Sequence, residues 1–281
     1  MNRLTYQHTN YITINDEELC SLTDAIFNRH RIDFTGYEKQ SLKRRVIRAM
    51  SVFGMEGIHH LWIRILADQT FIYSFMDEIS VGLTAMFRDP ILWRKMRTLL
   101  NNELQSKSLL SIWHAGCSTG EEIYTMNIVA RESIHKQSIR SWATDISKQA
   151  LEIARRGEYS IAKLAEYERN YKEYNLQGSL KWHYQKNDQN FVLDSSLNRH
   201  VTFNYHNLIT DSYSYHFDII FCRNVMIYFD NDTKVKLFDK FYNALNPGGL
   251  LIIGFYDAVM PLIDNRKFAI MDLDAKIFMK I

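Results

Sequence analysis

The sequence is poor in cysteine, and its cysteines lie far apart. Cys20, Cys117 and Cys222 form no CxxC pair in the 281 residues, so neither a zinc site nor a disulfide framework is indicated. Buried free thiols in a reducing compartment are the expected state. We therefore predict a protein without a bound metal and without disulfides.

Strong charge and long apolar runs are also missing. The net charge of +2 argues against a nucleic acid held through bulk charge, although a local basic patch remains compatible with it. No stretch approaches the roughly 20 apolar residues that a membrane span needs, and the first residues lack the apolar core of a signal peptide. We expect a soluble, cytoplasmic, monomeric protein without nucleic-acid binding or membrane insertion.

What is present is the composition of a globular protein with a substantial core: 46% hydrophobic and 23% charged residues. The length fits one large or two modest domains. Residues 1–90 read as helical, because apolar residues recur at helical spacing in four segments. These segments are 17–29, 37–53, 58–68 and 71–79. We predict a helical domain over 1–90 and a second domain over 91–281.

The pattern changes to alternating strands and helices from residue 109 onward. A short apolar run, a glycine-containing turn, a helix, a second strand and an acid follow one another, which is typical of a parallel sheet with crossover helices. The predicted strands are 109–115, 139–144, 217–222 and 250–255, and the predicted helices are 121–134, 148–156 and 233–245. Residues 157–199, rich in Tyr, Asn, Gln and Lys, are interpreted as an insertion of short strands, at 180–184 and 190–193, or irregular structure.

The turn Gly116-Cys117-Ser118-Thr119-Gly120 separates the first of these strands from its helix. Glycine allows a close backbone approach to a ligand, and a helix start offers free N–H groups. The spacing is not the GxGxxG of dinucleotide sites, and the two acids that follow, Glu121 and Glu122, would repel a phosphate. The turn therefore favours a cationic nucleoside such as S-adenosylmethionine, which has an ammonium, a sulfonium and no phosphate.

Asp145 ends the next predicted strand. Rossmann-like sites place an acid there to accept hydrogen bonds from the ribose hydroxyls. The alternative is that Asp145 only caps the helix that begins near Ile146.

Six ordered motifs resemble those of CheR-type methyltransferases. Residues 114–125 are similar to the family's GCSTGEEPYS motif, 143–147 to its next motif, and 217–230 to its most distinctive one. Residues 83–89 resemble its TxFFR segment, 246–249 and 154–159 agree as well, and 33–50 resembles its basic helical domain. The resemblance covers most of the chain.

The resemblance implies an α/β fold: a Rossmann-like class I methyltransferase domain with a mostly parallel sheet and helices on both faces. An N-terminal all-α domain and a small inserted β-subdomain, about 157–199, complete it. The implied enzyme is an S-adenosylmethionine-dependent protein-glutamate O-methyltransferase, with S-adenosylhomocysteine as product and no metal. The implied substrate is the cytoplasmic region of a chemoreceptor, and in some members the insertion binds a receptor peptide.

The family's roles carry over onto matching residues. The methionine end of the cofactor would be contacted by Gly116, Ser118 and Glu122. Asp145 would bind the ribose, and Asn207 and Leu208 would flank the adenine. The pocket would be lined by Arg223 and Asn224 and closed by Thr84 and Arg88. Arg88 and Tyr228 are the predicted catalytic residues. Lys43, Arg44, Arg45 and Arg48 form a basic helix, with Arg44, Arg45 and Arg48 as the predicted docking residues; a solvated helix face is the alternative. Pairing of Arg88 with Asp89, and a core position for Tyr228, are the alternatives for the catalytic pair.

The chain departs from the family pattern at four places. Ile123 replaces a proline, Met86 a phenylalanine, and Gly82 stands where an asparagine is frequent, while Gly254–Asp257 replaces GHSE. We expect these changes to leave the core of the cofactor site intact. They do not decide how the substrate is bound. The other readings are methylation of a non-receptor signalling protein and a non-catalytic cofactor-sensing module. A nucleic-acid methyltransferase is disfavoured because an NPPY-type loop, paired cysteines and a larger positive charge are missing.

Overall fold

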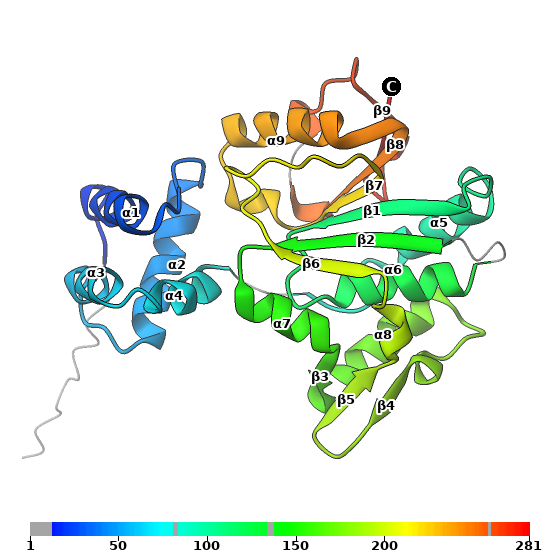
Figure 1. The fold of residues 1–281 in the computed structure, drawn as a ribbon, viewed down its shortest axis with the longest axis horizontal. Helices are drawn as coiled ribbons and strands as arrows, with labels where there is room; N and C mark the ends of the chain where they lie inside the picture. Colours follow the sequence, from blue (N-terminus) through cyan, green and yellow to red (C-terminus); the bar gives the residue numbers. More distant parts are fainter. Residues whose placement is uncertain (1–12, 81–83, 134–137, 258–259) are drawn as a thin grey trace, which may run out of the picture. The chain divides into compact units, whose positions relative to one another are not determined.

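The structure, a computed structural model, describes residues 13–80, 84–133, 138–257 and 260–281 (Figure 1). The chain divides into two compact units, Met1–Ile79 and Ser80–Ile281. The division falls earlier than residue 90, because Phe87 and Trp93 are buried in the core of the second unit. Gly82 lies outside the described residues.

The first unit is helical, as predicted. Its helices are α1 (Asp16–His30), α2 (Lys39–Val52), α3 (Ile58–Ala67) and α4 (Phe71–Ile79). Helix α1 packs against α3, and α2 against α4. The predicted apolar stripe on α2, Leu42, Val46 and Met50, is buried, because residues three and four apart share one helix face.

The second unit is built on a seven-stranded sheet with the order β6-β2-β1-β7-β8-β10-β9. Its strands are β1 (Leu109–Ala115), β2 (Ser138–Asp145), β6 (Val201–Tyr205), β7 (Phe217–Cys222), β8 (Leu245–Ile253), β9 (Phe268–Asp272) and β10 (Ile277–Lys280). The first five in spatial order are parallel, and β10 and β9 extend the sheet antiparallel. The predicted mostly parallel sheet is confirmed.

Helices cover both faces of this sheet. They are α5 (Pro90–Asn101), α6 (Glu121–Arg131), α7 (Lys148–Arg156) and α9 (Asn231–Ala244). Ile112 and Trp113 are neighbours on β1, so their side chains point to opposite faces. Ile112 joins the core cluster that contains Met96 of α5 and Met126 of α6, while the Trp113 ring lies 5.5 Å from that of Phe241 on α9.

The insertion is more helical than the sequence indicated. It contains β3 (Glu158–Ser160), η1 (Ile161–Lys163), α8 (Leu164–Tyr174), η2 (Leu180–His183), β4 (Tyr184–Lys186), β5 (Asn190–Leu193) and η3 (Ser195–Leu197). The strands form a small antiparallel sheet in the order β3-β5-β4. The strand expected over 180–184 is wrong, since most of it is the 3₁₀ turn η2, and α8 was not predicted.

The end of α9 also differs from the prediction. The helix ends at Ala244, and β8 begins at Leu245, so residues 246–249 lie within a strand. The register between β7 and β8 shifts at this segment, which accommodates the extra residues as a bulge. The Pro-Gly-Gly sequence therefore marks an irregularity inside a strand as well as the end of a helix.

Two glycines in the left-handed region offer a matched test of packing in this unit. Gly157, at the end of α7, has φ of +62°, and a Cβ there would collide with the Tyr124 hydroxyl. Gly248 has φ of +71°, but a Cβ there would meet open space among the described residues. Gly248→Ala should lower the free energy of unfolding by about 1–2 kcal/mol through backbone strain alone. Gly157→Ala should lose roughly a further 1–3 kcal/mol through overpacking.

Chemical denaturation of the full chain measures both values. If both variants lose the same free energy of unfolding, a side chain at position 157 does not overpack against Tyr124.

Candidate active site

The sheet brings most of the predicted cofactor residues to one edge. Strands β6, β2, β1 and β7 are consecutive neighbours, and predicted residues follow the carboxyl end of each. The chain adds β2 and β6 on one side of β1 and then returns to place β7 on the other side. Ligands bind in α/β sheets at such a switch point, outside the carboxyl ends of the strands.

The turn after β1 is held close to its neighbours. Gly116 and Gly120 have φ of +76° and +92°. A Cβ on Gly116 would lie 2.5 Å from a methyl of Val225, and one on Gly120 would lie 2.7 Å from the Cβ of Ala154. Both positions therefore require glycine for conformation and for space.

Asp145 joins this turn to the next strand. Its carboxylate accepts hydrogen bonds from the Ser118 backbone N–H at 2.8 Å and the Ser147 backbone N–H at 2.9 Å. Its carbonyl accepts from the His206 N–H at 3.1 Å, which brings the start of the Asn207 segment alongside. The capping alternative is wrong, because the side chain of Ser147 caps α7 by accepting from Ala150 N–H.

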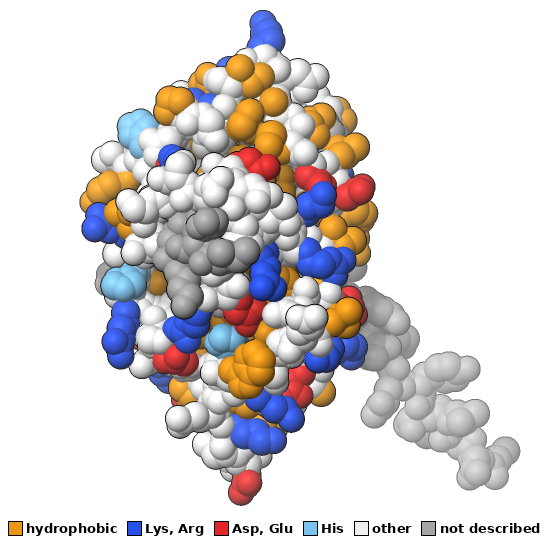
Figure 2. All heavy atoms as spheres, turned by 90° about the vertical axis from the view of Figure 1, so that its right-hand side faces the viewer, with side chains coloured by type: hydrophobic (Ala, Val, Ile, Leu, Met, Phe, Trp, Pro, Cys, Tyr) orange, Lys and Arg blue, Asp and Glu red, His pale blue; other side chains and the backbone are white. Residues whose placement is uncertain are grey.

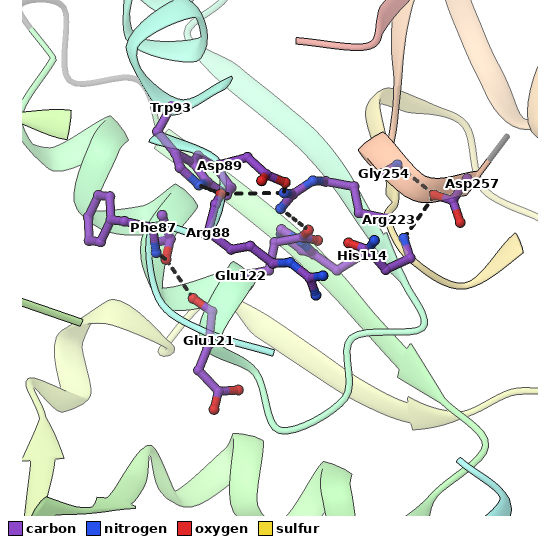
Figure 3. Close-up of polar contacts among 12 residues, drawn as sticks. Phe87, Arg88, Asp89, Trp93, His114, Glu121, Glu122, Arg223, Gly254 and Asp257 are labelled. Carbon is purple, nitrogen blue, oxygen red and sulfur yellow. Dashed lines mark hydrogen bonds and ion pairs between the residues drawn. The ribbon is translucent and has the colours of Figure 1, made fainter. Parts of the chain in front are cut away.

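Glu121 and Glu122 point in different directions (Figure 3). Glu121 is fully buried and accepts hydrogen bonds from Thr119, Lys163 and Tyr167. It therefore ties the turn to the insertion, and the expectation that both acids shape the ligand site is wrong for Glu121. Successive helical residues lie on different faces, so only Glu122 is turned toward the strand ends.

Arg223 forms ion pairs with two acidic residues, Glu122 and Asp89. Its guanidinium, with a side chain only 4% exposed, lies 3.0 Å from Glu122 and 2.6 Å from Asp89. His114 bonds to the second oxygen of Glu122 at 3.1 Å. Burial alone would raise the pKa of Glu122, but the hydrogen bond from His114 and the charge of Arg223 outweigh it and hold the pKa below its usual value. Glu122 is thus kept ionised.

The segment that carries Arg88 is anchored to the same core. Phe87 N–H donates to the Thr125 hydroxyl at 3.0 Å, and the Arg88 carbonyl accepts from the Trp93 indole at 2.8 Å and from Arg223 at 3.3 Å. Phe87 and Met86 are fully buried, so the methionine that replaces the family's phenylalanine fills a core position. The Arg88 side chain is partly exposed on the same side of α6 as Glu122, and Thr84 is partly exposed as well.

Asp257, the last residue of the altered Gly254–Asp257 motif, has a role that the sequence did not reveal. It is fully buried and accepts hydrogen bonds from the backbone N–H groups of Asn224, Gly254 and Ile227. Asn224 has φ of +59°, a conformation that needs such support. Burial raises the pKa of Asp257, and the three N–H groups oppose that rise. The acid therefore holds the turn that carries Arg223 and leads into η4 (Met226–Tyr228).

The remaining predicted residues lie nearby along the chain. Asn207 and Leu208 are buried after β6, and Asn207 is fixed by Asp211, whose carboxylate accepts from its N–H at 2.9 Å. Tyr228 ends η4 and is partly exposed, which contradicts a core position. Among the described residues, no cluster of His, Cys, Asp or Glu is placed to hold a metal.

Comparison with known proteins decides the family. The model for the CheR methyltransferase SAM-binding domain matches residues 82–277, and the model for the CheR all-alpha domain matches residues 17–80. The chain belongs to the CheR methyltransferase family. It is therefore an S-adenosylmethionine-dependent methyltransferase, and the predicted family and fold are confirmed.

Individual relatives resemble the chain over most of their length. The Pseudomonas putida protein Cher3, provisionally described as a methyltransferase, is 32% identical over 94% of this chain and 97% of its own. The chemotaxis protein methyltransferase of Borreliella burgdorferi is 30% identical over 88% of this chain and 90% of its own. That of Salmonella typhimurium is 26% identical over 94% and 91%.

The residues present in this CheR family member fit the cofactor. The Ser118 hydroxyl is buried and has no hydrogen-bond partner among the described residues, and the backbone N–H of the same residue donates to the Asp145 carboxylate. A buried polar atom without a partner costs free energy, so a ligand with polar groups would satisfy it. Asp145 supplies the acceptor that ribose hydroxyls require, and the buried Glu122 supplies a negative charge.

Glu122 makes the stability of the protein depend on pH. Because its pKa in the folded protein is lower than the usual 4.5, its ionised form contributes stability that is present above pH 4.5 and lost as pH falls through the folded pKa. Glu122→Gln should therefore be less stable than the parent protein at pH 7, and the difference should shrink below pH 4.5. Denaturant unfolding across this pH range measures it. Glu152→Gln, at an exposed acid on α7, is the control and should change little; a Glu122→Gln difference that does not vary with pH would contradict the ion-pair role.

Proposed function

We propose that this enzyme transfers a methyl group from S-adenosylmethionine to glutamate side chains of a protein, giving glutamate 5-O-methyl esters. Its substrate is the cytoplasmic region of chemoreceptors, and it acts as a monomer in the cytoplasm. The observation that carries the proposal is the sheet edge at which the predicted residues following β1, β2 and β7 lie. There the Ser118 N–H donates to Asp145, and Arg223 donates to the Arg88 carbonyl. The names of the relatives from Borreliella burgdorferi and Salmonella typhimurium support a chemotaxis protein as substrate. Among the described residues, no helix is long and apolar enough to cross a membrane.

In this reaction the main role of the protein is to position the reacting groups. The bound cofactor supplies a methyl group made electrophilic by the sulfonium. A glutamate carboxylate, with a reference pKa of about 4.3, is ionised at neutral pH and needs no general base. Holding the reacting atoms in line can supply roughly 7–11 kcal/mol.

The cysteines take no part in this scheme. Cys117 and Cys222 are buried, and burial raises the pKa of both thiols well above the usual value. They therefore remain protonated, whereas a nucleophilic cysteine must be a thiolate. This supports direct displacement by the substrate carboxylate and disfavours a covalent enzyme intermediate.

Arg88 and Tyr228 are the residues that we propose touch the reacting groups. Asp89, the acid next to Arg88, is paired with Arg223, and the backbone of Arg88 is fixed by Trp93 and Arg223. The planar guanidinium suits a carboxylate bound through two parallel hydrogen bonds. Tyr228 would direct the reacting oxygen through its hydroxyl.

Turnover with methyl-labelled cofactor and a chemoreceptor cytoplasmic fragment tests the proposal. Arg88→Ala should lower kcat by about 100-fold through lost positioning, and Tyr228→Phe by roughly 10-fold, the value of one hydrogen bond to a charged group. The label should be released as methanol by mild base, as for an ester. Arg169→Ala on α8 and Tyr215→Phe, at exposed positions, should retain full activity.

Calorimetry with S-adenosylhomocysteine separates chemistry from cofactor binding. Full activity in both the Arg88 and Tyr228 variants would remove these roles. A base-stable label would exclude a carboxyl ester, and labelling of another lysate protein in place of the receptor would favour a non-receptor signalling substrate.

The basic residues of α2 divide into two kinds. Arg44 and Arg48 are exposed and one turn apart. Arg45 is partly buried and donates to the Ile79 carbonyl at the end of α4, and Lys43 pairs with Asp16 on α1 at 2.9 Å. We therefore propose Arg44 and Arg48 as the residues that dock an acidic helical substrate, with Arg45 serving the fold as well.

Charge reversal at the exposed pair tests docking. Arg44→Glu combined with Arg48→Glu should raise KM at low salt with little change in kcat, and the effect should shrink as salt screens the charges. Arg29→Glu, on the exposed surface of α1, is the matched control. An unchanged KM in the double variant would support a merely solvated helix face.

A further inference from the structure

A second hollow lies at the opposite end of the parallel strands. It has a volume of about 660 Å³ and is formed by the amino ends of β1, β2 and β6 together with α6 and η3. The lining residues that matter for a ligand are Arg131, Ser141, Arg199 and His200. Figure 2 looks onto this end of the strands. None of these residues belongs to the cofactor site, which lies at the carboxyl ends.

We call this hollow the amino-end pocket. The charged residues that line it are all basic. Its described lining residues include Arg131, Arg140, Arg199 and His200, and none of them is acidic. Arg131 is held by Asp194 at 2.8 Å and by the Ser196 hydroxyl at 2.5 Å, so its charge is partly balanced. It also lies in the last turn of α6, where it offsets the partial negative charge of the helix end. Arg140 and Arg199 are exposed. Arg140 is the neighbour of Ser141 on β2, so its side chain points to the other face of the sheet. Arg131 and Arg199 therefore carry the positive charge that can act together with Ser141.

A buried hydroxyl in the wall has no partner. Ser141 is completely buried, and its Oγ makes no hydrogen bond among the described residues. Its backbone is fixed, because its N–H donates to the His200 carbonyl at 3.0 Å. A buried polar atom left unpaired costs about 1–3 kcal/mol, so this hydroxyl indicates a polar ligand independently of the arginines.

We propose that the amino-end pocket binds a phosphate-bearing small molecule of nucleotide size. Arginine guanidinium groups bind phosphate oxygens through paired hydrogen bonds, and the hydroxyl of Ser141 adds a further polar group. The volume falls in the range of about 300–1,000 Å³ that is usual for small-molecule sites. S-adenosylmethionine does not fit this description, because it has no phosphate. The pocket is therefore a site distinct from the methyl-transfer site.

Calorimetric titration of ATP into the full-length protein tests the proposal. The protein is first saturated with S-adenosylhomocysteine, so that the nucleoside cannot enter the cofactor site. ATP should bind, and adenosine, which lacks phosphate, should bind at least tenfold more weakly. Arg131→Glu combined with Arg199→Glu should weaken ATP binding at least tenfold, and Ser141→Ala should weaken it severalfold.

Arg169→Glu, at an exposed arginine on α8 outside the pocket, is the matched control and should leave ATP binding unchanged. Circular dichroism and methyl transfer by each variant show that the fold is intact. The proposal is overturned if ATP does not bind the saturated protein, if adenosine binds as well as ATP, or if the control variant loses as much affinity as the double variant.

Discussion

One hydrogen bond organises the predicted cofactor site: the Ser118 backbone N–H donates to the Asp145 carboxylate at 2.8 Å. It joins the turn after β1 to the end of β2, and it holds Ser118 at φ of +49°, a conformation that costs a non-glycine residue about 1–2 kcal/mol. The N–H groups of Gly116 and Cys117 add to this link by donating to the Thr144 carbonyl. The acid that would meet the ribose is therefore also the residue that sets the shape of the turn.

The insertion supports the same turn from outside the sheet. Tyr159 donates to the Thr119 carbonyl at 2.8 Å, and Tyr167 donates to Glu121 at the same distance. The hydroxyl of Tyr167 is buried and faces an anion, which raises its pKa far above the usual value and keeps it a donor. Two hydrogen bonds thus connect the insertion to the turn after β1. A movement of the insertion would therefore change the positions of Thr119 and Glu121.

Much of the fold could be predicted because its central strands are buried on both faces. All six residues of β7 are buried, and such a continuous apolar run is typical of a parallel strand. Strand β6 was missed because its residues are only partly buried or exposed. Helix α8 was missed because its buried stripe, which starts at Leu164, consists otherwise of tyrosines. The spacing of Tyr167, Tyr171 and Tyr174 was visible in the sequence.

The motifs predict which residues bind the cofactor, but they did not reveal the hydrogen-bond partners of those residues. Which of two adjacent acids faces the site depends on Lys163 and Tyr167, which lie about forty residues later and were assigned to an irregular insertion. Asp257 accepts a hydrogen bond from the backbone N–H of Asn224. Almost every residue type has a backbone N–H, so the sequence does not show which ones Asp257 binds.

The division of the chain after Ile79 has a consequence for how the protein melts. Each unit buries a core of its own, so each can lose its structure while the other keeps it, and a single all-or-none transition need not describe the whole chain. A bound cofactor would stabilise the unit that holds its pocket, because a ligand stabilises the folded state that binds it. A calorimetric scan with cofactor would then move one heat-absorption peak to higher temperature and leave a second nearly where it was.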